Sequence, residues 1–268
     1  FAGRYEVVRC LGHGGMGAVY EVLHRATQRK RALKILLAGL VSDDDARERF
    51  AAEASITAHI ESEHLVDVFD AGVDSETNSP FIVMELLKGY PLARRLEERR
   101  AFTVDEVLEV LGQIARALEQ THAAGIVHRD LKPDNVFATT RPDGTLLIKI
   151  LDFGIAKAVQ AASKKSRNTV NIGTPLYMAP EQFDGSSLDR RADLYSLGHI
   201  AFELLTGESY WEPELKSSGS TIAFLRALDR GPPEPASVRA ARLGIRVGPT
   251  FDAWFDRATA KSPAERYR

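Results

Sequence analysis

The sequence predicts an α+β fold in which a small N-terminal antiparallel sheet with one helix precedes a larger, mainly helical part. Runs rich in β-branched and aromatic residues, separated by turns, occupy the start of the chain. Apolar residues at helical spacing dominate the later part. The chain has 268 residues, of which 44% are apolar and 27% charged, so it can build one large domain or two lobes with a proper core.

Three strands are expected first, at residues 5–11, 18–24 and 31–37. The glycine-rich stretch 12–17 lies between the first two, and its G-x-G-x-x-G pattern also marks dinucleotide-binding folds, in which the glycines open a helix. Because strand-like residues follow here, the glycines are expected to bend a hairpin whose backbone N–H groups approach phosphate oxygens. A tight turn without a ligand would explain one or two of these glycines, but not four in six residues.

A helix is expected after the acidic, cap-like residues 42–45. Within it, Glu53 lies beside the face that carries Phe50 and Ala54. Lys34 lies inside the apolar third strand, where a buried cation needs a partner or a ligand. A solvated lysine on the outer face of the strand is the alternative. We expect Lys34 to pair with Glu53 and also to hold nucleotide phosphates.

Residues 128–154 gather the groups that phosphoryl transfer needs. Asp130 can take the proton of an attacking hydroxyl, and Lys132 supplies a mobile positive charge beside it. Asn135 and Asp152 offer hard oxygen ligands, which suit Mg²⁺. Either His-Arg-Asp or Asp-Phe-Gly alone arises by chance in a chain of this size, but the two in this order with these offsets favour an enzyme. His128 is assigned to structure.

The helical part is punctuated by caps and turns. A capping box at Thr103 and Glu106 opens a helix that Gly125 stops. A hairpin turn at 142–144 precedes an apolar strand at 146–151, which delivers Asp152 at its end. Another buried helix at 194–204 ends near Gly207. Residues 210–235, with several glycines and prolines, are expected to form loops around a short helix.

Together these motifs resemble the eukaryotic-type (Hanks) serine/threonine protein kinases, most closely those of bacteria, over nearly the whole chain. The resemblance implies a bilobal protein-kinase fold with an N-terminal lobe at 1–87 and a C-terminal lobe at 88–268. The usual final helix of the family is expected to be absent, because the chain ends soon after the motif at 261–266. The arginine of that motif, Arg266, is expected to pair with Glu181.

By the same resemblance, Lys34 and Glu53 are the activating pair, Asp130 is the catalytic aspartate and Lys132 contacts phosphate. The metal ligands are Asn135 and Asp152. ATP is the implied cofactor, together with Mg²⁺ or, as an alternative, Mn²⁺. The residues expected to enclose the nucleotide are Leu11, Gly12, Gly14, Gly17, Val19, Ala32, Lys34, Met84, Glu85, Leu87 and Phe137.

The stretch 173–181 resembles the segment that receives the substrate peptide, and Asp193 resembles the aspartate that braces the catalytic loop. Lysine two places after Asp130 is typical of serine/threonine kinases and not of tyrosine kinases. Protein substrates are therefore expected. Two alternatives are a nucleotide-sensing scaffold without turnover, which would need no proton acceptor, and a small-metabolite kinase, which ordinarily lacks the peptide-receiving segment.

A polar, basic segment lies between the metal ligand Asp152 and the peptide-receiving stretch. Arg129 is the cation through which related kinases hold a phosphorylated loop. We expect phosphate on Thr169, or else on Ser166 or Ser163, to pair with Arg129 and order the loop. The alternative is that these hydroxyls are ordinary solvated loop groups. Regulatory positions are thus expected at Arg129, Ser163, Ser166, Thr169 and Thr174.

The charge balance limits the partners. With 35 basic and 37 acidic residues the formal charge is −2, which argues against nucleic acid or an anionic membrane as the main partner. A single cysteine, Cys10, excludes an internal disulfide and suits a reducing compartment such as the cytoplasm. No apolar run approaches the roughly 20 residues of a membrane span. Because the chain begins with Phe1, we expect it to be part of a longer protein, which can carry a membrane anchor. The sequence assigns no oligomeric state.

Overall fold

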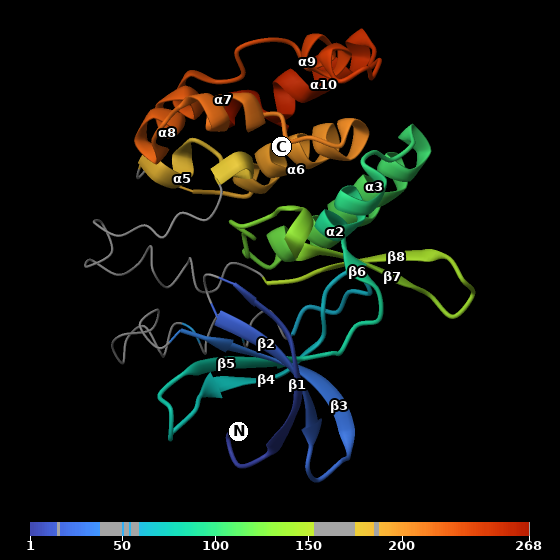
Figure 1. Cartoon of the computed structure of the whole chain (residues 1–268), viewed down its shortest axis with the longest axis vertical. Coiled ribbons are helices and arrows are strands. Elements are labelled where there is room, and N and C mark those ends of the chain that lie inside the picture. The colour runs from blue at the N-terminus through green and yellow to red at the C-terminus, as the bar shows by residue number, and fades with distance from the viewer. Residues whose placement is uncertain are drawn as a thin grey trace. The chain divides into compact units, whose positions relative to one another are not determined.

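The computed structural model describes residues 1–14, 17–37, 50, 54, 59–152, 175–184 and 188–267 (Figure 1). These residues divide into two compact units, the first from Phe1 to Gly89 and the second from Tyr90 onward. Five residues expected from the sequence to be functional lie outside the described residues and are not placed: Glu53, Ser163, Ser166, Thr169 and Thr174.

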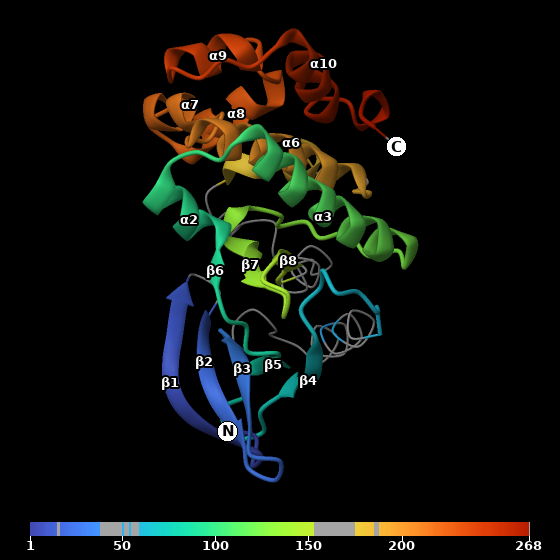
Figure 2. The same cartoon turned by 90° about the vertical axis from the view of Figure 1, so that its right-hand side faces the viewer.

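The first unit is a five-stranded antiparallel sheet with strand order β1-β2-β3-β5-β4 (Figure 2). The strands are β1 Tyr5–Gly14, β2 Gly17–His24, β3 Arg29–Leu36, β4 Val68–Val73 and β5 Pro80–Met84. The three strands expected from the sequence are confirmed, and β4 and β5 are additional. Their side chains pack around a small core made of Tyr5, Val22, Leu33, Phe81 and Val83.

Side chains join β1 and β4, the strands at opposite ends of the strand order. The Tyr5 hydroxyl on β1 donates a hydrogen bond to Asp70 Oδ2 on β4 at 2.9 Å. Arg4 lies just before β1 and forms an ion pair with the same oxygen, also at 2.9 Å.

The glycine-rich stretch joins β1 to β2 as a hairpin, in which Gly14 pairs with Gly17. The expectation of a hairpin in place of a helix is therefore confirmed. Gly17 has φ of 148°, and a Cβ atom there would lie 2.0 Å from the carbonyl oxygen of Ile35. No side chain fits at this position, which explains the requirement for glycine.

Two positions of the helix expected after residue 45 are described. Phe50 and Ala54 are helical, and their exposed fractions are 0% and 1%. Their burial agrees with the expected apolar face. Glu53, which lies between them in the sequence, is outside the described residues, so its pairing with Lys34 stays a prediction.

The second unit is mainly helical and carries a small sheet, β6-β7-β8 (Figure 1). The strands are β6 Tyr90–Pro91, β7 Val136–Thr140 and β8 Leu146–Ile150. The helices are α2 Leu92–Arg99, α3 Val104–Ala123, α5 Glu181–Asp184, α6 Arg191–Thr206, α7 Glu212–Ser217, α8 Thr221–Arg230, α9 Ala236–Arg242 and α10 Pro249–Ala258. Short 3-10 turns occur at Pro133–Asn135, Pro175–Tyr177 and Pro263–Glu265. Among the described residues, no helix combines the length and the apolar character that crossing a bilayer requires.

Helix α3 begins where the sequence predicts, and α6 ends where it predicts but begins at Arg191, three residues before the expected 194. The Thr103 side chain accepts a hydrogen bond from the N–H of Glu106, and the Glu106 side chain accepts one from the N–H of Thr103, so the capping box of α3 is confirmed. Helix α6 ends at Gly207, which adopts a left-handed conformation with φ of 80°. A Cβ atom at Gly207 would lie 2.3 Å from the carbonyl oxygen of Arg100, so glycine is needed here for space as well as for conformation.

The expectation of mostly loops at 210–235 is wrong, because α7 and α8 both lie in this region. Tyr210, Trp211, Phe224 and Leu228 are fully buried there and pack in one cluster with Phe202 of α6. The burial of these three aromatic side chains stabilises the packing of the helices. Gly219 between the two helices and the glycine and prolines at 231–235 after α8 concealed this pattern in the sequence.

Candidate active site

The loop at 128–135, called the catalytic loop after the role expected from the sequence, is held by a buried carboxylate on α6. Asp193 Oδ2 accepts hydrogen bonds from the backbone N–H of His128 and from His122 Nε2, each at 2.8 Å. Its other oxygen, Oδ1, accepts from the N–H of Arg129 at 2.9 Å. Asp193 is 1% exposed, and three hydrogen bonds stabilise its charge in this buried position. The expected bracing role of Asp193 is confirmed by these contacts.

His128 is fully buried and joins the loop to the strand that precedes Asp152. Its Nδ1 accepts a hydrogen bond from the N–H of Asp130 at 3.2 Å. An acceptor at Nδ1 means that the proton is on Nε2, which donates to the carbonyl oxygen of Leu151 at 2.9 Å. His128 is therefore a structural residue, as the sequence predicts.

Three of the residues predicted to be functional meet within this loop. Asn135 Nδ2 donates hydrogen bonds to the backbone oxygen of Asp130 at 2.8 Å and to its Oδ2 at 3.2 Å. Lys132 Nζ lies 3.6 Å from the same Oδ2. The side chains of Lys132 and Asp130 are 30% and 17% exposed, so both remain accessible to a ligand. A carboxylate, an ammonium and an amide thus lie side by side.

Asn135 and Asp152 lie at the same end of the β7–β8 pair. Val136 pairs with Ile150, and one step further the N–H of Leu151 donates to the carbonyl oxygen of Asn135 at 2.8 Å. Asp152 follows directly and has φ of 53°, an unfavourable conformation for a residue with a Cβ atom. Strained backbone of this kind is common where a side chain has to be aimed at a ligand.

The oxygen atoms of Asn135 and Asp152 suit a divalent cation whose remaining ligands come from phosphate and water. Among the described residues, no group of three or more His, Cys, Asp and Glu residues could hold a metal ion. Asn135 uses its Nδ2 for Asp130, so its amide oxygen is the group it can offer. One amide oxygen with the Asp152 carboxylate is what Mg²⁺ accepts when phosphate and water complete its shell. The residues present therefore fit such an ion.

The residues expected to bind the nucleotide lie in both units. In the first, Ala32 of β3 pairs with Met84 of β5, and both are buried at 6% and 7% exposure. Val19 of β2 pairs with Lys34 of β3. Leu11 is 40% exposed on β1, as an apolar residue that covers a ligand would be. The expected glycines at 12, 14 and 17 lie on β1 and β2.

Glu85 and Leu87 follow β5. The N–H of Glu85 donates to the carbonyl oxygen of Asp67 at 2.9 Å, and its side chain accepts from the N–H of Asp67 at 3.0 Å. The N–H of Glu85 is therefore already bonded within the first unit. In the second unit, Phe137 is half-buried on β7 opposite Lys149 of β8.

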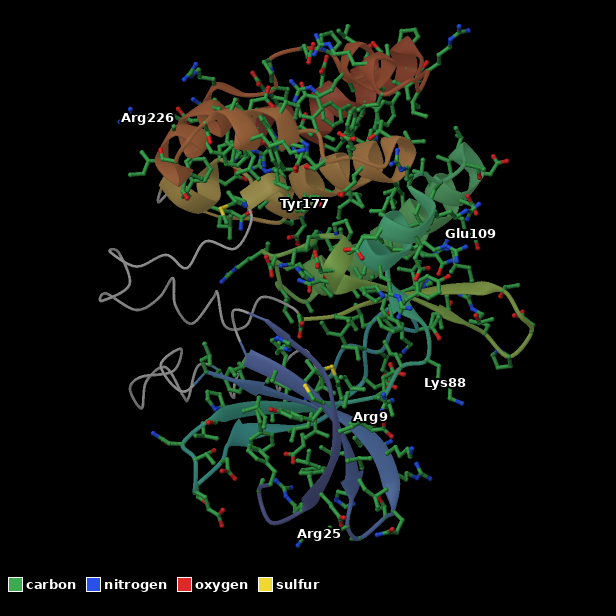
Figure 3. The ribbon with its side chains drawn as sticks, in the orientation of Figure 1. Arg9, Arg25, Lys88, Glu109, Tyr177 and Arg226 are labelled. Atoms are coloured by element: carbon green, nitrogen blue, oxygen red, sulfur yellow. The ribbon has the colours of Figure 1, made fainter. Side chains whose placement is uncertain are left out.

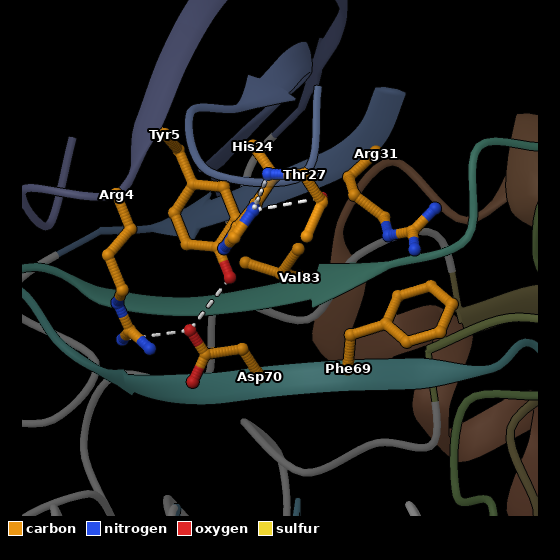
Figure 4. Close-up of a pocket in the computed structure, with 8 residues that line it drawn as sticks. All are labelled: Arg4, Tyr5, His24, Thr27, Arg31, Phe69, Asp70 and Val83. Carbon is orange, nitrogen blue, oxygen red and sulfur yellow. Dashed lines mark hydrogen bonds and ion pairs between the residues drawn. The ribbon is translucent and has the colours of Figure 1, made fainter. Parts of the chain in front are cut away.

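A pocket of about 260 Å³ lies in the first unit, lined by residues other than those expected to bind the nucleotide (Figure 4). Its lining residues are Arg4, Tyr5, His24, Thr27, Arg31, Phe69, Asp70 and Val83. Burial, together with the hydrogen bond to Asp70, raises the pKa of Tyr5 to about 12, so its hydroxyl remains a donor. None of these residues was expected to bind the nucleotide.

The segment after residue 174 is anchored to the end of the chain by a buried ion pair. Arg266 Nη1 and Nη2 donate to Glu181 Oε1 and Oε2 at 2.6 and 2.8 Å. The two side chains are 0% and 4% exposed. This bidentate geometry confirms the pairing expected from the motif at 261–266.

The sequence analysis missed three residues around the catalytic loop and the segment after residue 174. Each of them forms a hydrogen bond with a residue far away in the sequence. His122 donates to Asp193, and Gln182 donates to the carbonyl oxygen of Arg129 at 2.8 Å. The hydroxyl of Tyr177, labelled in Figure 3, donates to Glu203 of α6. No spacing pattern in the sequence points to these contacts.

The carboxyl group of Glu203 is perturbed. Its pKa is raised to about 7, mainly by burial. The hydrogen bond from Tyr177 lowers the pKa, and the nearby charges of Asp134 and Glu212 raise it further. Burial and the neighbouring Glu203 also raise the pKa of Tyr177 well above its usual value. Tyr177 therefore stays protonated and remains the donor of this pair.

Comparisons with known proteins extend these observations. The family described as "Protein kinase domain" matches residues 5–233. Pkn1, a serine/threonine-protein kinase of Myxococcus xanthus, is 41% identical over 265 residues, which cover 99% of this chain and 36% of Pkn1. The probable serine/threonine-protein kinase PknB of Corynebacterium glutamicum is 37% identical over 270 residues, which cover 100% of this chain and 40% of PknB. The chain thus spans less than half the length of these two relatives.

A solved structure is similar over the same extent. The crystal structure of the Mycobacterium tuberculosis PknI kinase domain matches with a TM-score of 0.73 and 30% identity, covering 98% of this chain and 90% of that one. The similarity confirms the α+β bilobal fold expected from the sequence. Use of ATP and a divalent metal ion is implied by the family. The chain therefore belongs to the protein kinase family, and its relatives are bacterial serine/threonine-protein kinases.

Proposed function

We propose that this domain transfers the γ-phosphoryl group of ATP to serine and threonine hydroxyls of proteins. The observation that supports this most directly is the cluster of Asp130, Lys132 and Asn135, in which the lysine and asparagine side chains lie within 3.6 Å of the Asp130 carboxylate. A domain that only binds nucleotide has no need of a carboxylate held in this way. A compartment that supplies ATP, such as the cytoplasm, follows from the same proposal.

Asp130 accepts a hydrogen bond from the substrate hydroxyl and takes its proton as the new bond to the γ-phosphorus forms. The bond between the γ-phosphorus and the bridging oxygen breaks, and ADP leaves. Lys132 neutralises charge on the phosphoryl oxygens, and its position beside Asp130 suits both tasks. Asn135 fixes the Asp130 carboxylate through Nδ2 while its amide oxygen is left for the cation.

Mg²⁺, when bound, would neutralise phosphate charge between Asn135 and Asp152. In the first unit we assign Lys34, paired with Glu53, to the ATP phosphates. The backbone of Gly12, Gly14 and Gly17 covers the same phosphates. Adenine is enclosed by the residues expected from the sequence, which are Leu11, Val19, Ala32, Met84, Glu85, Leu87 and Phe137.

The test is transfer of label from ATP to a generic basic protein in the presence of Mg²⁺. We expect Asp130→Asn and Lys34→Met to lower transfer by about 100-fold or more, because each removes a group acting on the transferred phosphoryl. Lys88→Met and Asp105→Asn, at exposed positions, are the matched controls and should retain activity. Nucleotide binding without transfer by the unmodified chain would instead favour a sensing scaffold, and label on small metabolites alone would favour a metabolite kinase.

Control by autophosphorylation is a second part of the proposal. Arg129 Nε is buried and has no hydrogen-bond partner among the described residues, which leaves a donor for a phosphate. Thr169, Ser166 and Ser163 are the proposed acceptors in the loop, and Thr174 lies in the peptide-receiving segment. All four lie outside the described residues.

Mass spectrometry of the chain after incubation with ATP and Mg²⁺ tests this control. Phosphate on Thr169, or on Ser166 or Ser163, should rise in parallel with activity. Arg129→Met should abolish the gain in activity without preventing the modification. Fully active protein with unmodified loop peptides would end this part of the proposal and leave the transfer reaction untouched.

A further inference from the structure

We infer that Gln182 is a positioning residue that couples the peptide-receiving segment to the catalytic Asp130; the inference rests on the kinase function proposed above. Gln182 lies on α5, one residue after Glu181. Its Nε2 donates to the carbonyl oxygen of Arg129 at 2.8 Å, and its Oε1 accepts from the N–H of Ala179 at 3.0 Å. One amide thus connects two segments that are 53 residues apart in the chain.

The carbonyl group that Gln182 holds belongs to the peptide unit that joins Arg129 to Asp130. The N–H of the same unit donates to His128 Nδ1 at 3.2 Å. A peptide unit is planar, so bonding both of its polar ends to side chains fixes the orientation of the plane. That orientation sets the direction in which the Asp130 side chain leaves the backbone.

Arg129 needs such support because its φ is 64°, a conformation that is unfavourable for a residue with a Cβ atom. Backbone of this kind persists where the surroundings impose it. Asp193 holds the N–H of Arg129 at 2.9 Å, and Gln182 holds its carbonyl oxygen. Two side chains from α6 and α5 therefore restrain the residue that directly precedes the catalytic aspartate.

The chemistry of the site requires an amide. The carbonyl oxygen of Arg129 needs a donor and the N–H of Ala179 needs an acceptor, and only the glutamine amide supplies both at this length. In Gln182→Glu an ionised carboxylate would face the Arg129 carbonyl oxygen and repel it. Protonation of that glutamate at lower pH would restore a donor. Gln182→Met keeps the length and removes both groups.

Gln113 of α3 provides a matched control in the same unit. Its Nε2 donates to the carbonyl oxygen of Leu146 at 3.1 Å, and its Oε1 accepts from the N–H of Ile148 at 2.8 Å. The amide bridges backbone groups as Gln182 does and is more deeply buried, at 2% exposure. Its partners lie on β8 and not on the catalytic loop.

The first experiment measures kcat and KM for a peptide substrate and for ATP. We expect Gln182→Glu and Gln182→Met to lower kcat roughly 10- to 100-fold, because small misplacement of a reacting group has effects of this size. The KM for ATP should change less than about twofold. Gln113→Glu and Gln113→Met should lower the melting temperature but leave kcat within about threefold of the unmodified chain. The activity of Gln182→Glu relative to the unmodified chain should increase as the pH falls from about 8 to about 5.5, because protonation restores the donor. The relative activity of Gln182→Met should not change over this range.

Unchanged kcat in both folded Gln182 variants, or an equal loss of kcat in the Gln113 variants, would overturn the inference. The second experiment is amide hydrogen exchange over residues 128–131, which needs no phosphoryl transfer. Exchange there should rise about tenfold in Gln182→Met and remain unchanged in Gln113→Met. A chain that transfers no phosphate would refute the proposed function, while the exchange result would still decide whether Gln182 holds the loop.

Discussion

Asp193 on α6 accepts a hydrogen bond at 2.8 Å from the backbone N–H of His128, 65 residues earlier in the chain. Because the carboxylate also accepts from Arg129 and His122, it fixes both the catalytic loop and the end of α3. The catalytic loop is thus held by a side chain outside the set of residues proposed to act on the phosphoryl group.

Asp193→Asn tests the strength of this restraint. An amide has one acceptor oxygen in place of two, and its NH₂ group would face a backbone N–H group. We expect the free energy of unfolding to fall by about 1.5 to 3 kcal/mol, as for other hydrogen bonds to charged groups. Denaturant unfolding measures this loss. Asp105→Asn, at an exposed position on α3, is the control, and an equal loss there would refute the special role of Asp193.

The Glu181–Arg266 pair should dominate the anchoring of the segment that is proposed to receive the substrate peptide. Arg266→Met leaves a buried carboxylate without its cation, which should lower the free energy of unfolding by about 3 to 5 kcal/mol. The exposed pair of Arg94 and Glu98 on α2 is the matched control, for which Arg94→Met should cost less than about 1 kcal/mol. Similar losses in the two variants would contradict this assignment.

Glu203 should make stability depend on pH. Its pKa is raised to about 7 in the folded state, so the protonated form stabilises the fold below the unfolded value of 4.5, and this contribution is lost as the pH rises through 7. The free energy of unfolding of the unmodified chain should fall on the order of 3 kcal/mol between about pH 4.5 and about pH 8. Glu203→Gln should abolish this fall, because the amide does not titrate. Melting temperatures of both proteins across this range test the prediction. Parallel curves would mean that Glu203 does not titrate there.

Gly207 should tolerate no side chain. Its φ is 80°, and a methyl group on its Cα would lie 2.3 Å from the Arg100 carbonyl oxygen, so Gly207→Ala should lower the free energy of unfolding on the order of 2 to 3 kcal/mol. Gly219 has φ of 64° with nothing within 4 Å of such a group, so Gly219→Ala isolates the conformational contribution, about 1 kcal/mol. Equal effects in unfolding experiments would show that the contact with Arg100 is relieved.

Local patterns were sufficient for a large part of the fold and for the loop that carries the chemistry. Asp130, Lys132 and Asn135 lie within six residues of one another, and their spacing alone brings them together in a turn that ends at Asn135. The hairpin at 12–17 and the capping box of α3 are equally local. Strand β4 was missed because Asp70 and Gly72 interrupt its apolar residues. Two helices, α7 and α8, lie where a single short helix was expected, because Gly219 interrupts the region and a glycine and three prolines follow α8 at 231–235.

The order of residues along the chain thus decided which chemical groups are present and how each short segment turns, because hydrogen bonds over a few residues depend mainly on neighbours. Packing of distant segments decided the rest. It brought Asp193 to the backbone of the catalytic loop and Gln182 to the carbonyl oxygen of Arg129. It also buried Glu203 beside Tyr177, which raises the pKa of Glu203. These contacts join groups 26 to 65 residues apart. Their geometry and burial exist only after helices such as α6 have packed, since burial is a property of the folded core and not of any single stretch of sequence.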